Sequence, residues 1–444
     1  MPLSHSTPPV VHWFSDLAAA LDRRSAPRLA LLFLGAVLAR GRRTVTRWIR
    51  AAGLSRDYRP CYTTLAAAGK RSPSIAARLL SRVVKPLFAA ERRLTLALDD
   101  TPTSRYGPHV QGAGIHHNPT PGPAGGSFVY GHVWVTLALL AHHASWGTIA
   151  LPLLAELYIR VKDLPKIDRA HRPAFRTKLE QAVALVRWAS VWLKHWGQPL
   201  WLVADGAYAK ANFLKPMREL GVTVVSRLRK DAALCTLPGP RPAGRRGRTR
   251  IYGEQRIVLA KRAGQKRGWT TGTFHLYGKP TTKRYKSFLA TWRPAGGVIR
   301  VVLVDEPTGW VAFFCTDPDA TVADILETVA DRFSLEIAFR DLKEVVGAGQ
   351  QQVRFIGASI GAFHLCLWTF TLTEAWAWNR SEAGLVEHRS ASPWDDEPRR
   401  PSHADKRRAW KRELLGEELR IALQRATSEA QIADATERLL DLAA

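Results

Sequence analysis

Four carboxylates in this chain stand where a fold could bring them together. Asp99 and Asp100 follow the short apolar run "LTLAL", and Asp205 follows a second run, "PLWLVA". The fourth, Glu336, lies in the amphipathic segment "RFSLEIAFRDLK". Carboxylate oxygens suit hard cations such as Mg²⁺, and two such ions roughly 3.5 to 4 Å apart can activate an attacking oxygen and stabilise a leaving one. The pattern predicts a two-metal site for phosphoryl transfer.

Three bases surround Glu336 in its segment, namely Arg332, Arg340 and Lys343. On a helix, their offsets of four and seven residues place them on or beside the face that carries Glu336. Such an arrangement would hold a phosphate next to metal-bound carboxylates. The alternative is a solvated surface helix with i,i+4 ion pairs. The opposite, core-facing stripe is predicted to contain Leu335, Ala338, Leu342 and Val345.

Strands are needed to position the acids. Residues 94–98 predict a buried strand that ends at the two acids, and residues 128–143 and 146–160 predict two more strands of the same sheet. A long helix is expected over 174–196, followed by strand, Asp205, helix and strand over 199–229. Because side chains alternate across a regular strand, only one of Asp99 and Asp100 would face the ions. These residues alone leave that choice open.

The remaining chain divides by composition. Residues 227–300 contain 19 Lys and Arg against two acids, a net charge of +17, and predict a basic, β-rich insertion with "RPAGRRGRTR" as an exposed loop. Residues 298–317 predict a hairpin that rejoins the sheet, 322–347 one helix, and 360–379 a buried helix. The predicted regions are 1–90 (helical, DNA-binding), 91–229 (first part of an α/β core), 230–297 (basic insertion), 298–380 (second part of the core) and 381–444 (linker and terminal helices).

The N-terminal helices are expected to form a separate module. Within it, "GRRTVTRWIRAAGL" predicts a short helix with Arg42, Arg43 and Arg47 placed to meet DNA, although a solvated basic face is an equal alternative. Further candidate DNA contacts are Arg227 and Arg229 at a strand end, and Tyr208, which could stack on a base or simply pack. In the exposed basic loop the candidates are Arg245, Arg246 and Arg248.

Composition favours a polyanionic partner. The chain has 444 residues, 65 Lys and Arg, 38 Asp and Glu, and a net charge of +27, while 46% of its residues are hydrophobic. This combination favours a large globular nucleic-acid enzyme over a ribosomal or membrane-surface protein. Four scattered cysteines indicate no disulfide framework or CxxC metal site and favour a cytoplasmic location. The longest apolar run has 11 residues, short of the roughly 20 that a membrane span needs, and we expect no membrane association.

Three motifs together resemble the DDE-class transposases of bacterial insertion sequences. The segment "RFSLEIAFRDLK" is similar to their YREK signature, which it matches at Arg332, Glu336 and Lys343, whereas Val329 stands at the Tyr position. "LALDDT" and "LWLVADGAYAK" resemble the first and second acid motifs, and relatives with Asp-x-Thr slightly favour Asp99 over Asp100. "KEVVGAGQQQVR" followed by "AFHLCLWTF" resembles the insertion-sequence family 701 group. The resemblance spans roughly residues 94 to 375.

The resemblance implies a ribonuclease-H-like α/β core with helical flanks. It implies that Asp99 or Asp100, Asp205 and Glu336 hold two Mg²⁺ ions, or Mn²⁺ in their place. It further implies cleavage at transposon ends and strand transfer into target DNA by direct in-line displacement, within a homodimer on double-stranded DNA in the bacterial nucleoid. Two alternatives stay open: a catalytically silent, domesticated DNA-binding protein, and a metal-dependent nuclease that never joins strands.

Overall fold

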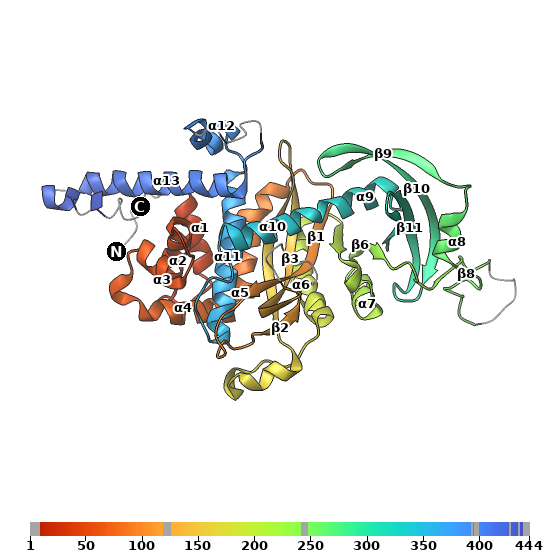
Figure 1. Cartoon of the computed structure of the whole chain (residues 1–444), viewed down its shortest axis with the longest axis horizontal. Helices are drawn as coiled ribbons and strands as arrows, with labels where there is room; N and C mark the ends of the chain where they lie inside the picture. The colour runs from red at the N-terminus through yellow and green to blue at the C-terminus, as the bar shows by residue number, and fades with distance from the viewer. Residues whose placement is uncertain are drawn as a thin grey trace.

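One mixed sheet organises the molecule (Figure 1). The computed structural model describes residues 9–118, 126–240, 247–391, 394, 399–425, 428–433 and 436–437. In these ranges the sheet has 12 strands in the order β2-β3-β1-β5-β6-β12-β11-β10-β7-β8, with β4 paired to β3 and β9 to β10. The strands are β1 Leu94–Ser104, β2 Gly114–His117, β3 Phe128–His143, β4 Gly147–Tyr158, β5 Leu200–Ala204, β6 Thr223–Leu228, β7 Leu234–Cys235, β8 Arg256–Ile257, β9 Thr270–Leu276, β10 Lys279–Trp292, β11 Gly297–Glu306 and β12 Gly309–Cys315.

The first half of the sheet matches the predicted α/β core. Strand β3 pairs antiparallel with β1 and β4, while β1, β5 and β6 are parallel to one another. Helix α7 (Ala211–Glu219) connects β5 to β6, which confirms the predicted strand, helix, strand unit. Helix α6 (Lys178–Leu193) begins with a capping box between Thr177 and Glu180 and packs against β3 and β4. This mixed α/β arrangement is consistent with a ribonuclease-H-like core.

Strand β1 does not end at its two acids, contrary to the prediction. Its antiparallel ladder with β3 continues to Ser104 opposite Gly131, whereas its parallel ladder with β5 stops at Leu98 opposite Ala204. Gly131 allows this close pairing, because a Cβ atom there would lie 2.1 Å from the Thr103 carbonyl oxygen. The acids therefore lie within β1, at a point where β1 still pairs with β3 but no longer pairs with β5.

The basic segment extends the same sheet. Strands β11 and β12 form the predicted hairpin, and β12 pairs with β6, so the hairpin rejoins the sheet as expected. Strand β10 then pairs with β11 and carries β9 and β7. Helix α8 (Leu259–Gly264) is the one described helix between β8 and β9. Hydrogen-bonded ladders thus run from β5 to the strands of the basic segment.

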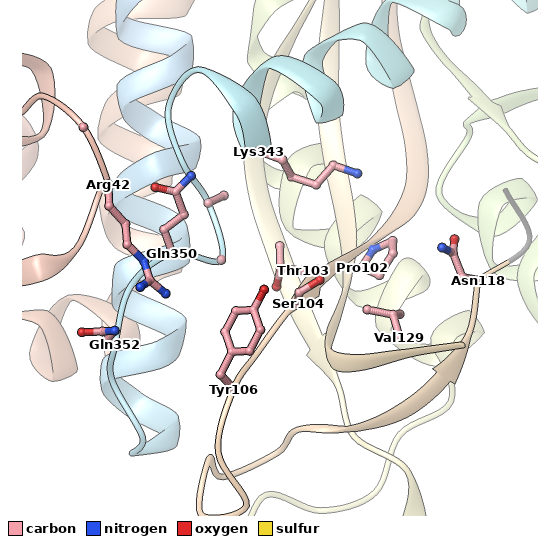
Figure 2. A pocket seen from close by; sticks show the side chains of 13 residues that line it. Arg42, Pro102, Thr103, Ser104, Tyr106, Asn118, Val129, Lys343, Gln350 and Gln352 are labelled. Carbon is pink, nitrogen blue, oxygen red and sulfur yellow. The ribbon is translucent and has the colours of Figure 1, made fainter. Parts of the chain in front are cut away.

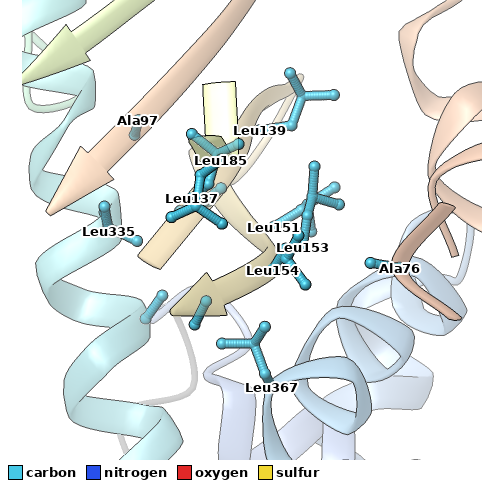
Figure 3. Packing of buried hydrophobic residues seen from close by; sticks show 14 of the residues in the cluster. Ala76, Ala97, Leu137, Leu139, Leu151, Leu153, Leu154, Leu185, Leu335 and Leu367 are labelled. Atoms are coloured by element: carbon cyan, nitrogen blue, oxygen red, sulfur yellow. The ribbon is translucent and has the colours of Figure 1, made fainter. Parts of the chain in front are cut away.

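The N-terminal helices share their core with the sheet, so the prediction of a separate module is wrong. They are α1 Pro9–Ala18, α2 Ala26–Leu38, α3 Val45–Ala51, α4 Arg59–Lys70 and α5 Ser72–Leu79. One continuous hydrophobic cluster joins them to the strands through α11 (Ile356–Ala377), and Figure 3 shows side chains from the strands, α5, α10 and α11 in that cluster. Helices α4 and α11 cross at glycines, since a Cβ on Gly361 would lie 1.8 Å from the Leu65 carbonyl oxygen. Leucine or alanine cannot replace glycine at such a crossing without moving a helix.

Helix α11 is long and apolar enough to cross a membrane, and 89% of its most apolar window is buried inside the protein. Burial in a protein core accounts for this composition, because a helix that is apolar on all sides needs apolar surroundings. The structure therefore places the predicted buried helix at 356–377, four residues earlier than expected at its start.

The helix that carries Glu336 is interrupted. Instead of one helix over 322–347, α9 (Val322–Asp331) and α10 (Phe333–Glu344) meet at Arg332. Leu335, Ala338 and Leu342 are buried as predicted, but Val345 is only half-buried because the chain leaves the helix there.

Two described helices follow α11. They are α12 (Glu382–Val386), in a segment expected to be a linker, and α13 (His403–Arg425), which extends away from the body in Figure 1. Short 3₁₀ or π turns occupy Ser55–Asp57, Leu80–Val84, Lys85–Phe88, Val161–Lys166, Arg169–His171, Lys194–Trp196, Gly206–Tyr208 and Glu387–Ala391.

Candidate active site

Asp99 and Asp205 lie side by side at the open end of two parallel strands. The last pair between β1 and β5 is Leu98 with Ala204, and each acid is the next residue along its strand. In open α/β sheets, ligands bind in the crevice beyond the carboxyl ends of the strands. The Asp205 carboxylate accepts a hydrogen bond of 2.9 Å from the Ala207 N–H, and the residue is exposed. This turn holds Asp205 at the crevice without covering it.

Asp99 and Asp100 face different partners. Asp99 Oδ2 lies 2.6 Å from the Arg332 guanidinium. Asp100 instead lies 2.6 Å from Lys178 Nζ and accepts a hydrogen bond of 3.3 Å from the buried Tyr208 hydroxyl. Successive side chains on a strand point to opposite faces, which separates the two carboxylates. Asp99 therefore shares a face with Glu336, and Asp100 is held by α6 and the turn after β5.

Arg332 bridges two of the acids. Its NH1 contacts Asp99, and its NH2 lies 2.7 Å from Glu336 Oε1. The planar guanidinium presents several donors in a fixed geometry and can satisfy two carboxylates at once. Arg332 sits at the junction of α9 and α10, beside Asp331, which His142 and Thr148 bind from β3 and β4. Strand contacts thus fix the backbone that carries the bridging arginine.

The crevice carries an excess of negative charge. The pKa of Asp99 is raised to about 6, chiefly by burial, with smaller contributions from nearby Asp100 and Asp205 and an opposing one from Arg332. Burial also raises the pKa of Tyr208 far above its ordinary value, and Asp100 adds to that shift, so its hydroxyl is a permanent donor. One arginine does not neutralise the carboxylates that it reaches.

The donor set suits a hard divalent cation. Across the described ranges no three His, Cys, Asp or Glu side chains come together in a ready-made metal cage, and Arg332 lies between Asp99 and Glu336. All the acids of the crevice offer oxygen ligands only, the type that Mg²⁺ requires. The pKa of Asp99 is raised mainly by burial and in smaller part by repulsion from Asp100 and Asp205, and a bound cation would offset both. By this chemistry Asp99, Asp205 and Glu336 fit a metal, while the single positive charge of Arg332 is shared between Asp99 and Glu336.

The predicted bases of α10 have different environments. Arg340 binds its neighbour Asp341 at 2.9 Å and does not reach Glu336. Lys343 is half-buried and makes no ion pair or hydrogen bond with any residue that the structure describes. Val329, at the position of the family Tyr, packs into a small apolar cluster with Val225 and Ile325.

The other candidate DNA contacts have different environments. Arg227 is exposed and lies against Gly206, next to Asp205, whereas Arg229 pairs with Asp231. Tyr208 is only 3% exposed, so the packing alternative holds over base stacking. Arg248 is exposed, and Arg245 and Arg246 lie outside the described residues.

The N-terminal arginines divide in role. Arg42 and Arg47 are exposed, the latter on α3, whose first turn is capped by Thr44. Arg43 is partly buried, and its N–H donates to Gln350 Oε1 at 2.7 Å. Arg43 therefore joins the N-terminal helices to the loop after α10.

A groove that was not foreseen lies beyond the acids, along the end of β1 (Figure 2). Its volume is about 1200 Å³, and it lies between Arg42, the loop after α10 and strands β1 and β3. In the sequence, its loop "KEVVGAGQQQVR" stands out only by family resemblance, and Tyr106 of the groove and Lys178 beside Asp100 do not stand out at all. No local pattern marks those two residues, because only the fold brings them to the crevice.

Comparison with protein families gives one match. The family described as DDE superfamily endonuclease matches residues 16–292, more than half of the chain. The matched region contains Asp99, Asp100 and Asp205, along with the N-terminal helices and most of the basic strands, and it ends before Glu336. The comparison with curated proteins gives no match.

Proposed function

Because this chain belongs to the DDE superfamily endonucleases, we propose that it is a DNA transposase that cuts the ends of a mobile element and joins them to target DNA. The observation that carries the proposal is the geometry at the open end of β1 and β5. There Asp99 and Asp205 are neighbours, and Glu336 reaches the same face through the shared guanidinium of Arg332. Acids from three separate segments thus border one crevice, with Arg332 between Asp99 and Glu336.

We assign Asp99, Asp205 and Glu336 as the residues that would hold divalent metal, Mg²⁺ or Mn²⁺. Such ions supply activation of the attacking oxygen and stabilisation of the leaving oxygen. Asp100 has Lys178 and Tyr208 as fixed partners, and its role in the proposal is to position β1. Asp99 is therefore the first acid in this assignment, and Asp100 is not a metal ligand.

Arg332 has a second role in the proposal, as a phosphate contact. Its guanidinium already lies within 2.7 Å of Glu336 and Asp99, where a DNA phosphate would have to approach. Arginine binds phosphate oxygens with two parallel hydrogen bonds. Arg227 beside Gly206 and Lys343 on α10 would hold the neighbouring phosphates of the same strand.

The basic strands would hold the flanking DNA. The net charge of +17 over residues 227–300 gives a field that draws a polyanion to the side of the sheet next to β6. Membership of the insertion-sequence family 701 group, assembly as a homodimer on paired ends and a cytoplasmic, nucleoid location are further parts of the proposal that rest on the resemblance.

The test uses the full-length protein, Mg²⁺ and labelled DNA carrying the ends of the element that encodes it. Joined products support transposition. Cleavage without joining would identify the chain as a nuclease, and binding without cleavage would identify a silent DNA-binding protein. Either of the last two outcomes contradicts the proposal.

The partner can be tested by salt alone. Each phosphate that the protein neutralises adds about −0.9 to the slope of log affinity against log salt concentration. A steep negative slope is expected for duplex DNA, and a flat profile would exclude DNA as the partner.

A further inference from the structure

The groove beyond the acids has walls from three distant parts of the chain. Arg42 comes from the segment before α3, Tyr106 from the residues after β1, and Lys343 with Gln352 from α10 and its loop. Figure 2 shows these side chains around a common space, with Lys343 extending from α10 toward the Pro102–Ser104 stretch. At about 1200 Å³ the groove is larger than sites that enclose a drug-sized molecule.

Its side chains suit a nucleobase. Tyr106 is 77% exposed and makes no ring contact or hydrogen bond with the described residues. Gln352 is exposed, and its amide has no partner in the described ranges. An open aromatic face and free amide groups are what proteins offer to the face and edge of an unpaired base.

Its charge suits a nucleic-acid backbone. Lys343 and Arg42 lie on the rim without an ion pair to any acid among the described residues, and none of the described residues lining the groove is acidic. Burial lowers the pKa of Lys343 from its ordinary value, and the charge of neighbouring Glu344 offsets this only in part. A partly desolvated lysine that forms no ion pair is stabilised by an anion that comes with the ligand.

Hydrogen bonds from buried side chains hold the loop after α10, which forms one wall of the groove. Buried Gln351 donates to the carbonyl oxygens of Arg43 and Gly347, each at 2.8 Å, and accepts from the Gly349 N–H at 3.0 Å. Arg105, also buried, donates to the Gln351 carbonyl oxygen at 2.5 Å. Gly349 has φ +97° and a Cβ there would lie 3.2 Å from Thr103, so the loop lies directly on β1. A site held this firmly does not need to order itself on binding.

The groove also lies close to the acids. Lys343 is seven residues beyond Glu336 on α10, roughly 10 Å along the helix. Ser104 is four residues beyond Asp100 on β1, about 13 Å along the strand. A strand whose phosphate reaches the acids would therefore bring its next nucleotides to the groove.

We propose that this groove binds an unpaired nucleotide of the DNA strand, with Tyr106 against the base, Gln352 at its edge, and Lys343 and Arg42 on the flanking phosphates. This inference rests on the proposed function and adds to it a substrate feature, DNA whose strands are separated next to the reacting phosphate. Paired duplex would present only its backbone here and would leave the exposed ring of Tyr106 without a role.

Binding of labelled oligonucleotides to the full-length protein tests the proposal, in a buffer without divalent metal so that no strand is cut. One probe is a blunt duplex, and the other is the same duplex with a short unpaired tail. The wild-type protein should prefer the tailed probe. Tyr106→Ala should weaken binding of the tailed probe by about 5- to 100-fold and leave the blunt probe unchanged, because stacking acts on the unpaired base alone.

Matched variants separate stacking from other effects. Tyr106→Phe should keep the preference, and Trp192→Ala, which removes another exposed aromatic ring outside the groove, should not alter it. Gln352→Ala should reduce the preference by a few-fold.

Three results would overturn the inference. If wild-type protein binds both probes equally, the groove does not take an unpaired nucleotide, although the proposed function stands. If Tyr106→Ala weakens both probes equally, the ring does not stack on a base. If neither probe binds, the proposed function fails together with the inference.

Discussion

Two clusters of acids and bases in this molecule have opposite electrostatics. At the first, the α11–α13 anchor, Glu374 of α11 lies 2.5 Å from Lys406 Nζ and 2.6 Å from His403 Nδ1 of α13. All three side chains are buried. Burial alone would raise the pKa of Glu374, but Lys406 and His403 lower it to about 2. One acid with two bases is fully neutralised there.

At the second cluster, the candidate active site, the ratio is reversed. Asp99 and Glu336 share Arg332, Asp205 stands beside them, and the pKa of Asp99 is raised to about 6. A purely structural ion pair would be neutralised as the anchor is. Burial raises the pKa of both acids, but the bases outweigh burial at Glu374 and Arg332 does not outweigh it at Asp99, and this difference distinguishes a site prepared for a cationic ligand.

The largest effect is expected from Glu336→Gln. If the crevice is catalytic, losing this carboxylate should lower DNA cleavage on the order of 10⁴-fold, as for other essential catalytic groups. Glu336 is half exposed, so the melting temperature should change little. Cleavage assays with Mg²⁺ measure the effect, and Glu344→Gln on the same helix is the control. Full cleavage activity in Glu336→Gln would show that the second cluster is not a catalytic site.

The reverse pattern is expected for Glu374→Gln at the anchor. The change leaves Lys406 buried without a carboxylate, and breaking a buried pair in this way costs about 3 to 5 kcal/mol of unfolding free energy. Denaturant unfolding measures it, and Glu417→Gln, in an exposed pair with Arg420, should have no measurable effect. An unchanged unfolding free energy in Glu374→Gln would mean that the anchor does not hold α13.

The two clusters should also respond to pH in opposite directions. Glu374 has a pKa below its ordinary 4.5, so its stabilisation is complete above pH 4.5 and is lost as the pH falls toward 2. Asp99 has a pKa above its ordinary 3.8, so its contribution is complete below pH 3.8 and is lost as the pH rises through about 6.

In metal-free buffer, Asp99→Asn should remove the loss of stability that the wild-type protein shows as the pH rises through the pKa of Asp99. Above pH 6 the variant should be at least as stable as wild type, with a gain of at most about 3 kcal/mol, the equivalent of a shift of roughly two pKa units. The unfolding free energies of wild type and Asp99→Asn, measured from about pH 4 to about pH 8, test this prediction. A variant less stable than wild type above pH 6 would show that Arg332 outweighs the burial of Asp99.

The smallest effect is expected from Arg340→Ala. Because Arg340 is exposed, its pair with Asp341 should contribute less than about 1 kcal/mol to the unfolding free energy. If Arg340 also contacts a phosphate, the salt slope of DNA binding should become shallower by about 1. Arg340→Lys, which keeps the charge, should restore the slope, and no change in slope would remove Arg340 from the DNA surface.

Much of the core could be predicted from the sequence, because buried strands and amphipathic helices have strong periodicity. Strands β3 to β6 and the hairpin of β11 and β12 follow from apolar runs alone. The end of β1 could not be predicted, since its continuation to Ser104 depends on pairing with β3 across the close approach at Gly131. A single sequence contains no direct record of such long-range pairing.

The sequence singled out the acids of the candidate site and Arg332 beside Glu336, but not the contact of Arg332 with Asp99 or the partners of Asp100. Asp99, Asp205 and Glu336 stand out by position and resemblance. Lys178, which binds Asp100, comes from a distant helix without a local signal, and Tyr208 was singled out without its contact to Asp100. The prediction that Arg340 flanks Glu336 did not anticipate Asp341, because helical spacing identifies neighbours on a face and says nothing of which neighbour binds more tightly.

The hydrogen-bonded continuity of the sheet has a mechanical consequence. Strand β12 pairs directly with β6, and β6 with β5, whose end carries Asp205. The basic strands are thus joined to the strand that carries Asp205 by continuous strand pairing. If DNA binds β9 and β10 as proposed, this ladder would keep a constant distance between that DNA and Asp205.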